Sequence, residues 1–196
     1  MVSIVVVTAP TEEPVSVDEA TYHCRIDDYN QTPYEESVQI KTLIAAARQH
    51  AESQLNRKLI TQTLEAYYDA FPVEFVLPPL QSVSYIKYVD ENGIEQTLAA
   101  DKYVVNSTSK PARITESYGN TWPTIRSQQN AVSVRFVAGY GAASAVPQCI
   151  KNWILMRVKT LYDGRDQLIA SNGNFVFDKQ FIDSLLDPER VWGGWA

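Results

Sequence analysis

The sequence has 196 residues and a formal net charge of −6, from 23 acidic against 17 basic side chains. A chain of this length buries a full hydrophobic core in one domain, or in one domain with an insertion, without help from disulfides or a structural metal. The acidic excess argues against a protein that grips nucleic acid through its phosphates.

The cysteines and the first residues argue against a disulfide-bonded secreted protein and against a membrane protein. Cys24 and Cys149 are the only cysteines, they lie far apart in the sequence, and they show no CxxC spacing. This pattern is typical of buried free thiols in a reducing compartment. The opening MVSIVVV lacks a basic flank and is too short an apolar run for a signal peptide or a membrane span. We expect it to form an extended arm or an edge strand, with no membrane association.

Two helices are predicted in the N-terminal part of the chain. Ser16 and Glu19 have the spacing of a capping box, in which each side chain satisfies a free backbone N–H, so a short helix is expected over residues 17–25. A longer helix is expected over residues 34–57, because apolar residues recur there at a spacing of three to four. This stripe consists of Ile40, Leu43, Ile44, Ala47, Ala51 and Leu55, whereas Lys41, Arg48 and Glu52 fall outside it.

Residues 59–141 have a different pattern. They consist of short runs rich in β-branched and aromatic residues, separated by turn signals such as PP at 78–79 and YGNTWP at 118–123. Glu91-Asn92-Gly93 lies between two such runs and predicts a hairpin turn, since Asn and Gly tolerate positive φ. We therefore expect a small antiparallel β-subdomain that is inserted between helices.

The C-terminal part returns to helix. Pro147 suits a first helical position because it has no N–H to leave unsatisfied, so a helix is expected over residues 147–163, with Gly164 as its stop. A last short helix is expected over residues 178–187, closed by Pro188. The predicted fold class is α+β: a helical core of residues 1–58 and 142–196 with extended arms at both ends, and the β-rich insertion of residues 59–141.

The run Gly139-Tyr140-Gly141 lies between a predicted strand and a helix. Nucleotide enzymes hold phosphate at such a place, because the free N–H groups at a helix start attract anions. The sequence GYGAAS, however, has only the first two glycines of a GxGxxG motif and lacks the Lys-Ser/Thr of a P-loop. We interpret the glycines as a sharp corner, not as a phosphate site.

No catalytic or metal site is predicted. His23 and His50 are the only histidines, and neither has a second ligand at a suitable offset for zinc. The sequence has no GxSxG motif and no cysteine beside an obvious base. Carboxylate pairs such as Asp27-Asp28 indicate solvated turns, since adjacency in sequence is not an acid/base pair across a cleft. We expect no enzymatic activity, no cofactor and no metal.

Two groups of aromatic residues require separate interpretations. Core and cross-strand packing explains most of those in the β-region, although they could also line a sugar or base-stacking face. These are Tyr67, Tyr68, Tyr85, Tyr88, Tyr103, Tyr118 and Trp122. The tail has no periodicity to bury its tryptophans, so contact with a partner and docking on the same chain both stay open. The candidate partner interface consists of Arg190, Val191, Trp192 and Trp195.

The order of these features resembles the head-tail connector (adaptor) proteins of tailed double-stranded DNA phages and prophages. The matching stretches span nearly the whole chain in the same order, and no catalytic motif comes with them. They are PVSVDEA, LIAAARQHAESQLNRKLITQT, LPPLQSVSYIKYVDENG, YGNTWP, NAVSVRFVAGYG, VPQCIKNWILMRVKTLYDGRD and LLDPERVW. The β-insertion departs from the plainest, all-helical members of that family.

The resemblance implies a subunit of a ring that lies beneath the portal, extends the DNA channel and offers a platform to the next protein. The implied partners are further copies of the chain, the portal protein, a head-completion or tail protein, and double-stranded DNA that passes without sequence-specific binding. The implied location is the head-tail interface of the virion, after assembly in the host cytoplasm. Two other functions remain open: a phage tail or baseplate module with an aromatic β-face, and a small hydrolase that uses carboxylates.

Overall fold

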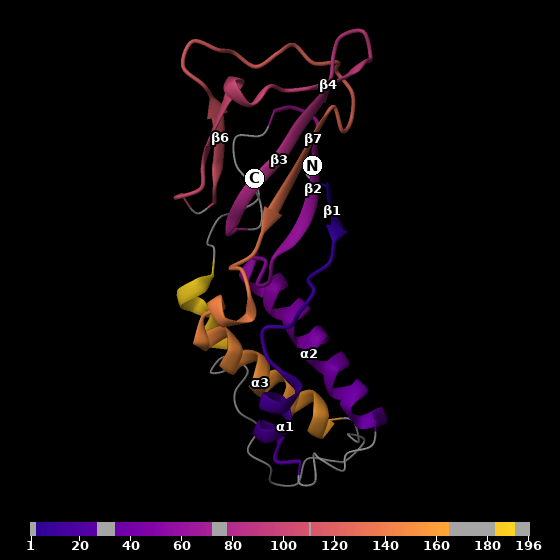
Figure 1. Cartoon of the computed structure of the whole chain (residues 1–196), viewed down its shortest axis with the longest axis vertical. Helices are drawn as coiled ribbons and strands as arrows, with labels where there is room; N and C mark the ends of the chain where they lie inside the picture. The colour runs from indigo at the N-terminus through magenta and orange to yellow at the C-terminus, as the bar shows by residue number, and fades with distance from the viewer. Residues whose placement is uncertain (1–2, 27–33, 72–77, 110, 165–182, 191–196) are drawn as a thin grey trace. The chain divides into compact units, whose positions relative to one another are not determined.

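The structure is a computed structural model that describes residues 3–26, 34–71, 78–109, 111–164 and 183–190 (Figure 1). The chain divides into two compact units. The β-unit comprises residues 1–11 and 56–140, and the helical unit comprises residues 12–55 and 141–196. The fold class is α+β, as the sequence predicts. No helix of the described ranges is long and apolar enough to span a membrane.

The β-unit contains two antiparallel sheets. The larger has five strands in the order β1-β2-β7-β3-β4, and the smaller consists of β5 and β6. The larger sheet is built from β1 (Ser3–Thr8), β2 (Gln62–Tyr68), β3 (Leu80–Val89), β4 (Glu95–Thr97) and β7 (Val132–Ala138). The smaller is built from β5 (Tyr103–Asn106), which follows the 3₁₀ turn η2 (Ala100–Lys102), and β6 (Arg113–Glu116). The N-terminal segment, in indigo in Figure 1, is thus an edge strand.

Alternating apolar residues explain the core of the β-unit. In β7 every second side chain, from Val132 to Ala138, is buried, as a strand with period two requires. These residues join inward-facing side chains of β2 and β3 and Ile114 of the smaller sheet in one apolar cluster. Much of the aromatic content is used here: Tyr68 belongs to the cluster, and Phe71, Tyr88, Tyr103 and Trp122 pack against it.

The predicted hairpin turn joins β3 to β4. Gly93 has φ +83°, and its N–H donates to the carbonyl of Asp90 at 2.9 Å. The Asp90 carboxylate accepts hydrogen bonds from the backbone N–H groups of Ile94 and Asn92. The bond from Ile94 is the largest of the effects that hold the pKa of Asp90 below its ordinary value. Asp90 therefore completes the turn that the Glu91-Asn92-Gly93 signal predicts.

The helical unit contains α1 (Val17–Cys24), α2 (Tyr34–Leu55) and α3 (Gln148–Asp163), with 3₁₀ turns η3 (Ala143–Ala145) and η5 (Ser184–Glu189). The capping box forms as predicted: the N–H of Glu19 donates to Ser16 Oγ at 3.1 Å, and the N–H of Ser16 donates to Glu19 Oε2 at 2.7 Å. The first helix ends one residue before its predicted limit, because Arg25 takes a left-handed conformation with φ 55°.

Three other boundaries differ from the predictions. The long helix ends at Leu55, because Asn56 has φ 51°, a conformation that asparagine tolerates. Pro147 caps α3 and precedes its first residue. The helix predicted over 178–187 lies partly outside the described residues, and its described end is the 3₁₀ helix η5, with Pro188 inside it. A 3₁₀ helix accepts proline there because its φ range includes the value that the ring imposes.

The three α-helices pack through their apolar stripes. The predicted stripe of α2 is buried at Ile40, Ile44, Ala47, Ala51 and Leu55. α3 contributes Ile150, Trp153, Ile154 and Val158, and α1 contributes Ala20 and Cys24. Burial is the main cause that raises the pKa of the Cys24 thiol, and both cysteines are free, with Cys149 only half-buried.

Two charged residues outside the predicted stripe of α2 are nevertheless buried. Arg48 is 7% and Glu52 is 5% exposed. Arg48 Nε lies 2.6 Å from Glu13 Oε2, and its Nη1 lies 3.4 Å from Glu52 Oε1. Burial of a charge is costly unless it is paired, and the segment that precedes α1 supplies Glu13 as the partner. The helical periodicity gives no sign of this contact.

The glycine corner between β7 and η3 has the conformation that the sequence predicts. Gly139 has φ +126° and Gly141 has φ +124°. A Cβ at Gly139 would lie 2.5 Å from both the carbonyl carbon and the oxygen of Ile60, whereas a Cβ at Gly141 would meet only Ala145 Cβ, at 3.7 Å. Two constraints therefore favour glycine at position 139: its positive φ, and the close approach of the Ile60 backbone.

Replacement of Gly139 by alanine is expected to destabilise the fold more than replacement of Gly141. Both variants place a side chain at a strained φ, which costs about 1–3 kcal/mol. Gly139→Ala adds a backbone clash, which costs about 1–3 kcal/mol more. The free energy of unfolding in urea measures the difference, with Gly141→Ala as the matched control. Equal losses in the two variants would show that the approach to Ile60 is not a constraint.

Candidate interaction surface

Most of the predicted partner interface lies beyond the described part of the chain. Val191, Trp192 and Trp195 are outside the described residues, and Arg190 is the last one before them. Arg190 follows η5, and its Nη1 lies 3.3 Å from Asp187 Oδ1. The structure thus fixes the point from which the tail departs.

That point of departure is anchored on α3. The indole Nε1 of Trp153 donates to Asp183 Oδ1 at 3.2 Å, and Leu186 of η5 is fully buried. Trp153 in turn stands edge-on to His50 of α2, with ring centroids 5.3 Å apart. The base of the tail is therefore connected to two helices of the unit.

The two histidines have different surroundings. His23 is exposed on α1, and His50 is half-buried, with its Nε2 3.1 Å from Gln54 Nε2. Within the described ranges, no group of three or more His, Cys, Asp or Glu side chains gathers in a way that could hold a metal ion. His50 packs against Trp153, which is a structural role.

The anion-attracting position after the glycine corner is occupied by the chain itself. The backbone N–H of Ala143, at the start of η3, donates to Glu12 Oε1 at 3.0 Å. An internal carboxylate thus takes the place that a phosphate would need. Together with the steric role of Gly139, this contact explains the Gly-Tyr-Gly run as a corner.

A row of charged and aromatic side chains crosses the face of the larger sheet opposite its apolar core, and Glu65 in this row is only 8% exposed. The row consists of Glu65 on β2, Arg135 on β7, Tyr85 and Lys87 on β3, and Glu95 on β4, and we call it the charged row. Arg135 Nη2 lies 2.7 Å from Glu65 Oε2, and Tyr85 donates from its hydroxyl to Glu65 Oε1 at 3.0 Å. Lys87 Nζ lies 2.6 Å from Glu95 Oε1.

Tyr85 is the centre of the charged row. The Arg135 guanidinium lies 5.0 Å and the Lys87 ammonium 5.1 Å from the centroid of its ring, within the range of cation–π attraction. Burial, followed by the hydrogen bond to Glu65 and the charge of that carboxylate, raises the pKa of Tyr85. The two acids and two bases of the row balance each other, so it stabilises the sheet and presents no excess charge to a ligand.

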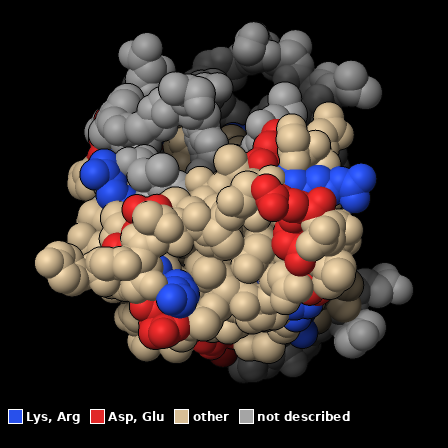
Figure 2. All heavy atoms as spheres, turned by 90° about the horizontal axis from the view of Figure 1, so that it is seen from above, with Lys and Arg blue, Asp and Glu red and all other residues tan. Residues whose placement is uncertain are grey.

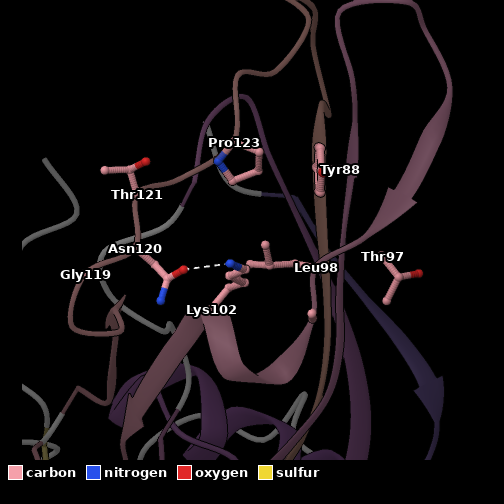
Figure 3. A pocket seen from close by; sticks show the side chains of 9 residues that line it. Tyr88, Thr97, Leu98, Lys102, Gly119, Asn120, Thr121 and Pro123 are labelled. Atoms are coloured by element: carbon pink, nitrogen blue, oxygen red, sulfur yellow. Dashed lines mark hydrogen bonds between the residues drawn. The ribbon is translucent and has the colours of Figure 1, made fainter.

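A hollow of about 390 Å³ lies beside the C-terminal end of β3 and the short strand β4 (Figure 3). Its wall includes Tyr88, Leu98, Lys102, Asn120 and Pro123. The Lys102 ammonium donates a hydrogen bond to Asn120 Oδ1 at 2.7 Å, so this charge is bound to another residue of the wall. The hollow shows no convergence of charged groups on its centre, and we assign it no ligand.

The charge on the surface is mixed. On the face drawn in Figure 2, acidic and basic side chains lie next to each other in small groups, between larger areas of neutral surface. This matches the pairing within the charged row. On this face, therefore, no area of one sign of charge dominates.

Replacement of Glu65 by glutamine is expected to lower the pKa of Tyr85 and the melting temperature. A raised tyrosine pKa means that the folded protein keeps the proton longer than the unfolded chain, whose value is 10.0. This contribution is complete below that pH and is lost as the pH rises through the raised value. Glu65→Gln should therefore lose less stability in alkaline solution, although its melting temperature near neutral pH falls by a few degrees, about the effect of one lost charged hydrogen bond.

NMR of ¹³C-labelled tyrosine measures the Tyr85 titration, and calorimetry measures the melting temperature. Glu95→Gln is the control, because it removes an exposed carboxylate of the same row that does not bond to Tyr85. A Tyr85 pKa that is the same in Glu65→Gln and in the native chain would contradict the geometry described above.

No protein-family model matches the sequence, and no curated relative matches it. Among solved structures, a chain in the neck of an empty gene transfer agent (GTA) particle computed with C6 symmetry superposes with a TM-score of 0.77 at 21% identity, over 98% of both chains. A chain in the virion of the native GTA particle gives 0.73 at 21%, over 97% of this chain and 98% of that one. A chain in the native neck computed with C12 symmetry gives 0.65 at 20%, over 98% of both. At these identities the likeness establishes a shared fold along nearly the whole chain.

Proposed function

We propose that this chain is a structural subunit of the neck of a phage-like particle, a head-tail connector whose copies form a ring beneath the portal. The observation that carries the proposal is the likeness in fold over 98% of both chains to a chain in the neck of a GTA particle. The motif order in the sequence supports the same assignment independently. The C6 and C12 symmetries in which the similar chains were computed are those of closed cyclic assemblies.

The chemistry of the described surface supports a structural role. The buried charges of the helical unit pair with each other, and those of the charged row balance across the sheet. Such charges hold elements in place and are not free to bind a substrate. The aromatic residues also disfavour the alternative of a sugar-binding β-face, because Tyr68, Tyr88, Tyr103 and Trp122 belong to the core or pack against it.

The proposed partners are further copies of the chain, the portal protein, a head-completion or tail protein, and double-stranded DNA in transit. Subunits with a net charge of −6 repel the DNA backbone, which favours passage over adhesion. We further propose that the helical unit is the connector core and that the β-unit is an insertion that supplies contact surface. The location that follows is the head-tail interface of the particle.

Immunogold labelling of particles tests the proposal. Antibodies raised against the purified chain should place gold at the junction of head and tail, and particles that lack the chain should carry filled heads without attached tails. Antibodies against a tail-tip protein serve as the positional control. Gold at the tail tip, or the absence of the chain from purified particles, would refute the assignment.

The tail is proposed to bind a partner in the neck, with Arg190, Val191, Trp192 and Trp195 as the contacts. Replacement of both tryptophans by alanine should leave the melting temperature nearly unchanged and should reduce incorporation into particles at least severalfold, because buried tryptophans dominate interfaces. Tyr118→Ala, which truncates a fully exposed aromatic residue, is the control. Unfolding of the double variant would assign the tryptophans to the core, and unchanged incorporation would exclude the tail as the contact.

A further inference from the structure

The strand β1 is an apolar edge without the usual protection. It is the first strand of the larger sheet and pairs only with β2, so one side of its backbone has no partner strand in the described part of the chain. Val5, Val6 and Val7 are 50%, 49% and 43% exposed, and no charged residue occurs before Glu12. Natural edge strands are normally blunted by charges, proline or bulges, and here only an irregularity between Val6 and Thr8 is present.

On the other side of the same sheet, a stretch of β3 of matching length has no strand partner in the described ranges. β4 covers β3 only at Lys87, Tyr88 and Val89. The remaining outer edge of β3, from Leu80 to Tyr85, has no strand partner among the described residues and spans six positions. β1 also has six residues. Both segments, SIVVVT and LQSVSY, are free of charge.

The directions and faces of these two edges agree as well. The strands alternate in direction across the antiparallel sheet, so a β1 strand placed beside β3 by simple continuation runs antiparallel to it, in line with β4. Ile4 and Val83 both pack against the core cluster. Val5 shares a cross-strand row with Glu65, and Ser82 pairs with Val137 on the same solvent-facing side. A register that pairs Ile4 with Val83 therefore also pairs Val5 with Ser82.

We propose that β1 of one subunit adds to the open edge of β3 in the next subunit, so that the sheet continues from copy to copy around the ring. This inference rests on the proposed function, because it takes the occupant of the edge to be a second copy in a cyclic assembly. A cyclic assembly needs two different surfaces that fit each other, and β1 and β3 are such a pair. Backbone hydrogen bonds supply the affinity, and the alternating side chains set the register.

Cysteine cross-linking in assembled particles tests the pairing. The variant carries Val5→Cys and Ser82→Cys in a background of Cys24→Ala and Cys149→Ser, which removes the native thiols. Within one chain these two positions are separated by three strand spacings, roughly 14 Å, whereas a disulfide needs Cα atoms within about 7 Å. Any disulfide between them therefore joins two subunits. Mild oxidation should produce a ladder of dimers, trimers and higher oligomers on a non-reducing gel.

Two matched variants identify the contact. Val104→Cys with Ser82→Cys should give no ladder, because Val104 lies on β5 of the other sheet. It is a matched control, since its exposure of 51% is close to the 50% of Val5. Val5→Cys alone should remain monomeric, whereas a dimer in that variant would show twofold pairing of β1 with β1 and would overturn the proposal. As a second measurement, Val5→Lys should lower incorporation into particles at least tenfold, and added Ser82→Glu should restore most of it, because the charges face each other.

The outcomes separate this inference from the proposed function. Particles that contain the double-cysteine chain but yield only monomer, together with normal incorporation of Val5→Lys, would overturn the β1–β3 pairing and leave the connector assignment intact. Absence of the native chain from particles would overturn the connector assignment and, with it, the pairing. Circular dichroism and the melting temperature of the purified variants establish that each substitution leaves the subunit folded.

Discussion

The architecture of the β-unit depends on β7, which is paired along its whole length on both sides. Its residues align with β2 from Gln62 to Tyr68 and with β3 from Leu80 to Tyr88. One face of β7 places Val134 and Phe136 in the core, and the other holds Arg135 against Glu65 and Tyr85. A strand near the C-terminal end of the β-unit thus organises segments that precede it by 44 to 76 residues, and both the core and the charged row follow from this pairing.

Local signals in the sequence are sufficient to predict α1, α2, α3 and the turn at Gly93, but not the 3₁₀ helix η5. The Ser16–Glu19 capping box, the stripe of α2 and the turn at Gly93 each depend on residues within a few positions of one another, and all three form. Strand order was not predictable in this way, because antiparallel partners are chosen by tertiary packing. Arg48 shows the same limit, because its partner Glu13 lies 35 residues away in the sequence. Its position on the helix alone predicts that its side chain faces solvent.

The two candidate surfaces also differ in whether the sequence alone predicts them. The tail was identified by composition, since two tryptophans beside glycines have no local core, whereas the charged row required knowledge of the sheet register. Glu65 and Arg135 are 70 residues apart, and neither has a distinctive neighbour in sequence. A pattern of hydrophobic alternation predicts that such residues face solvent, but it does not predict which strands bring them together. The edge of β1 is recognisable in outline from the sequence, whereas the stretch of β3 that has no strand partner among the described residues is not.

The two ends of the segment 57–140 are hydrogen-bonded to each other. The N–H of Tyr140 donates to the carbonyl of Leu59 at 3.0 Å, Arg57 Nη1 donates to the Tyr140 hydroxyl at 2.8 Å, and Gly139 lies against Ile60. Residues 59–139 therefore leave and re-enter the chain at nearly one point, which is the arrangement that tolerates exchange of a whole segment. β1 pairs with β2 from outside this segment, so an exchanged segment would have to keep a partner strand for residues 3–8.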